Sequence, residues 1–459
     1  MKKIFQMKSF LSIIYIVWVL TQEMVLYSLC ISLFYRKRNI IRYNKSLEKL
    51  GKNLCDALPK LGPAFIKLGQ FLSTRYDLIS PIVCRELKKL QDNAPTVDFK
   101  SIERVLILEL GDKYEQLKVD EIPVAAASVA QVHKGHTICG CIIAIKVLRP
   151  KVKKNFMSNI NLMMLVAGFL NRFVSPARRL RLVEVVKLIT ETANSELNMQ
   201  MEGAAADKLR YNCREQDGVY IPKVFWEYTT SSVLVLEWID GNKIEDCDID
   251  TRKDLAIKLA FLFFKQAYVD GFFHADIHPG NIMIDKAKRL ILVDFGMFSY
   301  LPERDRLSLA EIIYAFVQKD YEKVSALHFR AGYVPADNDS LEKLENRFAL
   351  ACRTIAEPIF GKPKAEISIS KLLRRLFEIT SEFNMETQPQ LVLLQKNMMS
   401  LESVLAILDP DVNMWLLVEP WFTEWAKNNL GFASEFKRKY HRLNHLLSKV
   451  EFIIESVNT

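Results

Sequence analysis

Hydrophobic positions follow a helical period in the first part of the chain. Between about residues 40 and 115 the apolar residues recur every three or four positions, as in the series Leu47, Leu50, Leu54 and Leu58. This spacing marks one face of a helix. Ser80-Pro81 has the sequence of an N-cap followed by proline at the first helical position, and it predicts the start of a further helix. We therefore expect a helical extension here.

The pattern changes near Ile122-Pro123. Residues 124–133 predict a strand, a tight loop and a second strand, and 141–147 form an apolar, β-branched run typical of a strand. Helical periodicity returns from about 152 to 213, and two strand-like runs follow up to Asp240. A long apolar helix is predicted at about 251–270, and helices again from about 302. This order predicts an α+β fold with two lobes and a cleft between them.

Composition and charge narrow the class of protein. The chain has 459 residues and is 50% hydrophobic, which is typical of a globular protein. Its net charge of +9 suits binding to an anionic surface or ligand. Basic residues do not alternate densely with aromatic ones and no nucleic-acid-binding motif is found, so we expect no nucleic acid partner. The scattered cysteines favour reduced thiols in a cytosolic type of compartment.

An apolar stretch from Phe10 to Tyr35 precedes the basic cluster Arg36-Lys37-Arg38. It is long enough to span a bilayer. However, Glu23 lies in its middle, where a carboxylate costs on the order of 3 kcal/mol. We favour an interfacial helix anchored by aromatic and basic residues, with a spanning helix and a helix buried in protein as the alternatives.

The strongest chemical signal lies between residues 271 and 296. Phosphoryl transfer needs a carboxylate near the accepting hydroxyl, an amide and a carboxylate on Mg²⁺, and a cation on the phosphates. Asp276 and Asn281 have the spacing of a kinase catalytic loop, and Asp294-Phe295-Gly296 follows a β-rich run. Aspartates that only cap turns would seldom occur in this order and spacing.

Upstream residues fit the same chemistry. Lys146, in Ala-Ile-Lys on a predicted strand, resembles the lysine that holds the α- and β-phosphates in kinases. Glu196 and Glu202 are the candidate partners for it on the following helix. Six residues apart, they would lie about 120° apart around one helix, so one lysine cannot easily serve both. A second lysine is expected, and Lys67 is the natural candidate.

The predicted phosphate loop differs from that of ordinary kinases. Where these have glycines, this chain has alanines and a serine, at Ala125, Ala126, Ala127 and Ser128. Alanine resists positive φ, so we expect a stiffer loop that cradles phosphates differently.

Three motifs together resemble the UbiB family of atypical kinases, also called aarF-domain proteins, over about residues 40 to 425. They are Lys67-Leu68-Gly69-Gln70, the alanine loop with Gln131-Val132-His133, and the run from His274 to Asn281. The segment from Leu408 to Trp421 is similar to the proteobacterial ubiquinone-biosynthesis branch. The resemblance implies a protein-kinase-like fold. We expect a membrane-associated helix at 1–40, a helical extension at 41–120, an N-lobe at 121–240 and a helical C-lobe at 241–459.

The resemblance also implies a role for each site residue. Lys146 would bind phosphate and pair with Glu202, Asp276 would be the catalytic acid or base, and Glu237 and Ile239 would belong to the hinge that meets adenine. Mg²⁺ would be held by Asn281 and Asp294, and ATP would lie in the cleft. Regulation would rest on a part of the extension that covers the active site, through Lys67, Gln70 and Glu196.

One residue departs from the family pattern. The motif Glu-x-Asp reads Glu196-Leu197-Asn198 here, so one negative charge near the nucleotide is lost. This change affects the expectations for metal handling and autoinhibition.

As a function, the resemblance implies an ATPase or atypical kinase that supports ubiquinone biosynthesis. Its expected place is the cytoplasmic face of a bacterial inner membrane, as a peripheral protein or with a single N-terminal anchor. Expected partners are anionic lipid, and polyprenyl-phenol quinone precursors or the ubiquinone-biosynthesis complex. Two alternatives are a non-catalytic, nucleotide-gated lipid-binding scaffold and a small-molecule phosphotransferase.

Overall fold

The computed structural model describes residues 37–73, 80–91, 96–127, 129–173, 182–214, 218–335, 341–360 and 389–430, with a few positions between 372 and 385. The described residues form two compact units. Unit 1 contains those up to Lys208, together with Pro222–Ile239 and Asp294–Met297. Unit 2 contains Leu209–Ile221, Asp240–Val293 and those from Phe298 onward.

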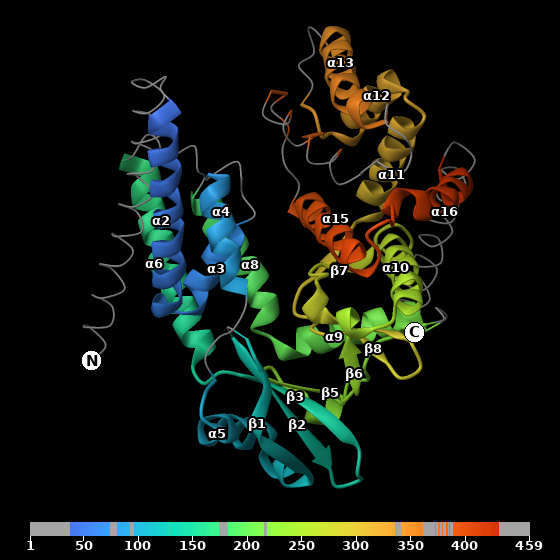
Figure 1. The fold of residues 1–459 in the computed structure, drawn as a ribbon. Coiled ribbons are helices and arrows are strands. Elements are labelled where there is room, and N and C mark those ends of the chain that lie inside the picture. The colour runs from blue at the N-terminus through green and yellow to red at the C-terminus, as the bar shows by residue number, and fades with distance from the viewer. Residues whose placement is uncertain are drawn as a thin grey trace, which may run out of the picture. The chain divides into compact units, whose positions relative to one another are not determined.

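The helices expected in the first part of the chain are present and lie in unit 1. They begin with α2 (Lys37–Leu61), α3 (Pro63–Leu72), α4 (Pro81–Leu87) and the 3₁₀ turn η1 (Lys88–Gln91). The leucine face of α2 is buried at Leu47, Leu54 and Leu58. The Ser80 hydroxyl accepts a hydrogen bond from Ile82 N at 3.3 Å, which confirms the predicted cap. The helices α6 (Val152–Phe173) and α8 (Leu182–Glu196) pack against α3 (Figure 1).

An antiparallel sheet forms the rest of unit 1. Its strand order is β1-β2-β3-β5, in which β1 is Leu117–Ala126, β2 Ala130–Thr137, β3 Ile142–Leu148 and β5 Val233–Glu237. The strands predicted at 124–133 and 141–147 are therefore confirmed. Two 3₁₀ turns, η2 (Gly111–Gln116) and η3 (Trp226–Tyr228), lie next to the sheet.

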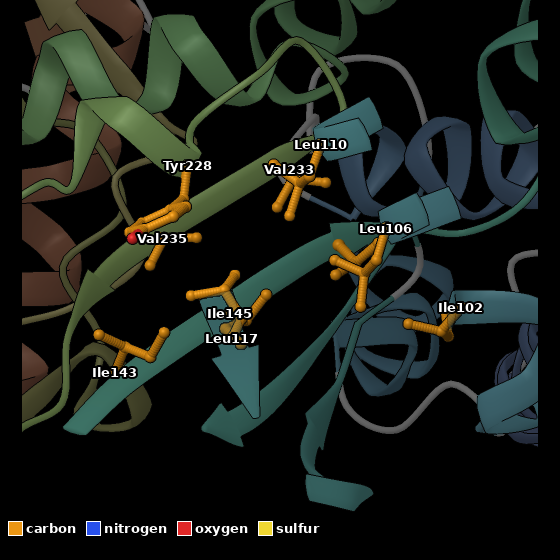
Figure 2. Packing of buried hydrophobic residues seen from close by; sticks show 10 residues of the cluster. Ile102, Leu106, Leu110, Leu117, Ile143, Ile145, Tyr228, Val233 and Val235 are labelled. Carbon is orange, nitrogen blue, oxygen red and sulfur yellow. The ribbon is translucent and has the colours of Figure 1, made fainter. Parts of the chain in front are cut away.

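The helix α5 (Phe99–Leu110) packs against the sheet. Figure 2 shows the apolar cluster between them, in which α5 supplies Ile102, Leu106 and Leu110. The strand β3 contributes Ile143, Ile145 and Val147 to the same cluster, and all three are fully buried. Because side chains alternate along a strand, Lys146 must face the opposite side of the sheet. The α5 core thus fixes the direction in which Lys146 points.

Unit 2 combines short strands with long helices. The strands β4 (Val219–Tyr220), β9 (Leu290–Leu292), β8 (Ile282–Asp285) and β6 (Gly241–Lys243) form one sheet in that order, and β10 (Phe298–Tyr300) pairs with β7 (Phe272–His274). Two 3₁₀ turns occur, at η4 (Ile244–Asp246) and η6 (Pro279–Asn281). The later helices are α11 (Glu303–Val317), α12 (Tyr321–Ala331), α13 (Leu341–Phe360), α15 (Pro389–Leu408) and α16 (Met414–Asn429).

The helix predicted at about 251–270 is α10 (Ile249–Phe264), which continues as one π-helical segment, Lys265–Asp270. It packs against α15 and α16 within unit 2 (Figure 1). Among the helices that the structure describes, none has the length and apolarity needed to cross a bilayer. The apolar stretch from Phe10 to Tyr35 lies outside the described residues.

Candidate active site

Lys146 lies between two carboxylates in unit 1. Its Nζ donates to Glu202 Oε1 and to Asp294 Oδ1, each at 2.7 Å. The Glu202 side chain is 1% exposed and that of Asp294 is 48% exposed. Burial lowers the pKa of Lys146, but the two carboxylates outweigh it, so its pKa lies above the ordinary value. The site therefore keeps a charged ammonium beside a solvent-accessible carboxylate.

The two candidate glutamates lie on different helices. Glu196 is the last residue of α8, and Glu202 lies in the first turn of α9 (Met199–Cys213). Between them, Asn198 Oδ1 accepts a hydrogen bond from Gln200 N at 3.2 Å, so Asn198 caps α9. The expectation of a single helix was wrong, because a cap residue ends the first helix and starts the second. Asn caps a helix as well as Asp does, so the departure from Glu-x-Asp removes a charge while the cap is kept.

Each glutamate still has its own lysine. Lys67 Nζ, on α3, lies 2.5 Å from Glu196 Oε1, and both side chains are mostly buried. The two predicted pairs, Lys146 with Glu202 and Lys67 with Glu196, are therefore present. A regulatory role for the second pair stays a prediction.

Gln70, expected on the same face as Lys67, binds elsewhere. Its Nε2 donates to Leu90 O in η1 at 3.2 Å. At Gly69 a Cβ atom would lie 2.3 Å from Leu90 Cδ1 and 2.7 Å from Leu58 Cδ1, so a larger residue would have to displace the ends of these two leucine side chains. Gly69 and Gln70 thus hold α3 against the rest of the extension, while Lys67 contacts Glu196.

The alanine loop is a narrow turn. Ala125 and Ala126 belong to the β1 ladder, opposite Val132 and Gln131. Ala127 N donates to Ala130 O at 2.8 Å and closes the turn. Ser128 lies outside the described residues. The loop is tied down by backbone hydrogen bonds on both sides, but its contact with phosphates stays a prediction.

The expected hinge begins at the end of β5. Glu237 N donates to Lys223 O at 2.8 Å, and Trp238 N donates to Ile142 O at 3.1 Å. Ile239 is the last residue of this segment of unit 1, and Asp240 begins a segment of unit 2. A role of Glu237 and Ile239 in adenine binding stays a prediction.

Asp294 has an unusual backbone conformation. Its φ is +59°, in the left-handed region that residues other than glycine seldom adopt. Its Oδ1 also accepts a hydrogen bond from Gly296 N at 3.3 Å. Strained residues of this kind concentrate at functional sites.

In unit 2, Asp276 lies in a loop that begins after β7. The buried His274 accepts a hydrogen bond from Asp276 N through Nδ1 at 3.2 Å. Asn281 Nδ2 donates to Asp276 O at 3.0 Å, so the amide oxygen of Asn281 is the atom that remains for a metal ion. The spacing between Asp276 and Asn281 thus corresponds to a closed turn.

Two functional candidates were missed at the sequence level. Lys396, on α15, donates to Asp276 Oδ1 at 3.1 Å. Burial raises the pKa of Asp276, but Lys396 and then His278 outweigh it, so the pKa lies below its ordinary value. The neighbouring Asn397 accepts from Ile277 N at 2.9 Å and donates to His274 O. The available signal was the polar triplet 395–397, which interrupts an apolar run of α15 between residues 391 and 399.

Comparisons with known proteins agree with the expected family. The model of the ABC1 atypical kinase-like domain matches residues 89–328, and that of the UbiB helical domain matches residues 352–413. A protein of Marinobacter nauticus called "Probable protein kinase UbiB" is 39% identical over 87% of this chain and 74% of its own length. A Pseudomonas putida protein of the same name is 37% identical over 89% of this chain and 77% of its own length.

One solved structure has a similar fold. It is Rv3197 of Mycobacterium tuberculosis, in its complex with erythromycin. The two chains superpose with a TM-score of 0.54 at 24% identity, over 84% of this chain and 98% of the other. With the matched kinase-like domain, this likeness identifies the fold as α+β and protein-kinase-like.

Proposed function

Because the chain belongs to the UbiB family of atypical kinases, we propose that it binds Mg-ATP and acts as an ATPase or phosphotransferase in support of ubiquinone biosynthesis. The observation that carries this proposal is the ion-paired cluster of Lys146, Glu202 and Asp294, with both N–O distances at 2.7 Å. A purely structural pair of Lys146 and Glu202 would not need a second, half-exposed carboxylate in a strained backbone conformation.

In this proposal Lys146 binds the nucleotide phosphates, and the buried Glu202 holds its ammonium in place. The chemistry of the metal-binding residues fits Mg²⁺, which prefers carboxylate and amide oxygens. Asp294 offers a half-exposed carboxylate, and Asn281 turns its amide nitrogen inward to Asp276 O. When bound, Mg²⁺ would neutralise charge on the phosphates.

Asp276 is the proposed proton acceptor. The oxygen of the accepting hydroxyl, or of water in an ATPase, forms a bond to the γ-phosphorus. The bond from this phosphorus to the β–γ bridging oxygen breaks, ADP leaves, and the hydroxyl proton passes to the Asp276 carboxylate. A pKa below its ordinary value keeps Asp276 ionised and ready to accept that proton.

The role in ubiquinone biosynthesis rests on the relatives that carry the name UbiB. We propose a polyprenyl-phenol precursor or the biosynthetic complex as partner, and anionic lipid on the cytoplasmic face of a bacterial inner membrane as the surface. Residues 149–183 contain no Asp or Glu and many Lys and Arg. On α6, Leu165 is 72% exposed and Phe169 is 61% exposed. Basic and exposed apolar residues on one helix favour contact with anionic lipid.

The test is ATP turnover by the purified protein, with and without vesicles of anionic phospholipid, and with and without a quinone-precursor-like phenol. Wild type is compared with Asp276→Asn, which keeps the shape of the side chain. We expect lipid-stimulated turnover in the wild type and its loss in the variant. Binding of Mg-ATP without turnover under any condition would contradict the enzyme and favour the nucleotide-gated lipid-binding scaffold.

A further inference from the structure

Two adjacent polar residues of α15 hold the loop that carries Asp276. Asn397 is 1% exposed and contacts the loop backbone on both sides of Asp276, at His274 O and Ile277 N. Its neighbour Lys396 reaches the Asp276 carboxylate itself, at 3.1 Å. The two hydrogen bonds of Asn397 fix α15 against the loop, and the third contact, from Lys396, places its ammonium at the Asp276 carboxylate.

Lys396 has donors left for a second partner. Its ammonium has three N–H groups, and Asp276 accepts one hydrogen bond. Among the described residues Asp276 is its one hydrogen-bonded partner, and its side chain is 27% exposed. The other nitrogen near this carboxylate belongs to His278, whose Nε2 lies 3.6 Å from Asp276 Oδ2 and whose side chain is 47% exposed. Lys396 is thus the permanent cation of this loop.

A phosphoryl transfer site needs a cation at this point. A carboxylate that accepts the proton must come close to a terminal phosphate of the same charge sign, and this repulsion raises the barrier unless a cation lies between them. Lys146 is already assigned to the nucleotide phosphates in the proposed function, and two carboxylates take up two of its three N–H groups, so Asp276 needs a cation of its own.

We propose that Lys396 is a catalytic residue, which binds the terminal phosphate of ATP while it holds the Asp276 carboxylate. The proposal rests on the proposed function and adds a residue of the helical domain to its machinery. It has a specific consequence. Lys396 contributes to the affinity for ATP and contributes nothing to the affinity for ADP, which lacks that phosphate.

The experiment compares full-length wild type with Lys396→Met and Lys396→Arg. Dissociation constants are measured by calorimetry with Mg²⁺ for ADP and for a non-hydrolysable ATP analogue. One charge-assisted hydrogen bond corresponds to a loss of affinity of about 10- to 100-fold. We expect a loss of this size in Lys396→Met for the ATP analogue, unchanged affinity for ADP, and partial recovery in Lys396→Arg.

Lys258→Met is the matched control. Lys258 also forms an ion pair in unit 2, with Asp254 at 2.6 Å in the same helix, and its loss should leave the ratio of the two affinities unchanged. If Lys396→Met loses ADP and ATP analogue equally, or neither, the proposal is overturned while the proposed function stands. If the wild type binds neither nucleotide, the proposed function fails, and the proposal with it.

Discussion

The two units hold their functional carboxylates in different ways. In unit 1, the carboxylate of Asp294 is held by a charge, because Lys146 joins it to the buried Glu202. In unit 2, the loop around Asp276 is held by neutral groups. Asn281 and Asn397 bind its backbone, and Gln266 Oε1 accepts from His274 N at 3.1 Å. Lys396 adds a charge to this loop but does not determine its shape.

This difference bears on how each site tolerates change. A buried ion pair that loses one member leaves an uncompensated charge, which costs several kcal/mol. A loop held by amide groups keeps its shape when its carboxylate is replaced. Substitution of Lys146 should therefore reduce both function and stability, whereas substitution of Asp276 should reduce function and leave stability nearly unchanged.

The largest effect is expected for Lys146→Met. It leaves Glu202 buried without its cation, and we expect a loss of about 3 kcal/mol in the free energy of unfolding, with loss of nucleotide binding. Chemical denaturation and calorimetry measure the two quantities. The double variant Lys146→Met with Glu202→Gln should recover much of the stability and none of the binding. If Lys146→Met were as stable as the wild type, the claim that an ion pair holds the unit 1 site would be wrong.

Asn397→Leu should come next. Leucine has a similar volume, but it removes the hydrogen bonds to His274 O and Ile277 N in a buried site, which costs about 2 kcal/mol in all. We expect reduced stability and a fall in turnover that exceeds the change in ADP affinity. Unaltered turnover in Asn397→Leu would show that neutral hydrogen bonds do not hold the loop.

Acid should act on unit 2 through a buried histidine. Burial lowers the pKa of His328 to about 4, and its Nδ1 binds Val324 O at 2.7 Å. Between pH about 6.5 and 4 the unfolded chain binds a proton that the folded chain does not, so stability falls as the pH falls. The loss at pH 4 amounts to about 3 kcal/mol.

The variant His328→Phe tests this assignment. Phenylalanine keeps an aromatic ring beside Phe348, whose ring centroid lies 4.9 Å from that of His328, and it cannot take up a proton. Denaturation at pH 7 and pH 4 should show a smaller acid-induced loss in the variant than in the wild type. An equal loss in both would assign the acid sensitivity to other groups.

The smallest effect is expected at Asn198. Asn198→Ala removes the cap of α9 and should cost about 1 kcal/mol, whereas Asn198→Asp keeps the cap and should stay within about 0.5 kcal/mol of wild type. The midpoint of thermal unfolding measures both. A large change in Asn198→Asp would mean that the missing charge matters to the Lys146 cluster.

Much of the site was predictable because its signals are local. The alternation of apolar residues around Lys146 predicts a strand, and a lysine between buried neighbours must point away from them. The order and spacing of Asp276, Asn281 and Asp294 predict phosphoryl-transfer chemistry on their own. Glu196 and Glu202 were also named as candidate partners, and the pairing of each with its lysine followed from the resemblance to the family.

Other features required the tertiary structure. The break between Glu196 and Glu202 depends on a cap whose sequence signal, a single Asn, is weak. The hydrogen bond from Gln70 to Leu90 depends on how α3 packs against η1. The periodicity of one helix does not predict this packing. In neither case does the local sequence state which neighbour the side chain meets.

The sequence by itself thus determined the fold class, the family and the charged residues of the candidate site, because short motifs and their spacing along the chain indicate each of them. Only the tertiary structure revealed that Lys396 meets Asp276, 120 positions earlier in the chain. The physical reason is that a long-range contact is fixed by the packing of whole helices. A lysine in a helix looks the same in sequence whether it faces solvent or a partly buried carboxylate.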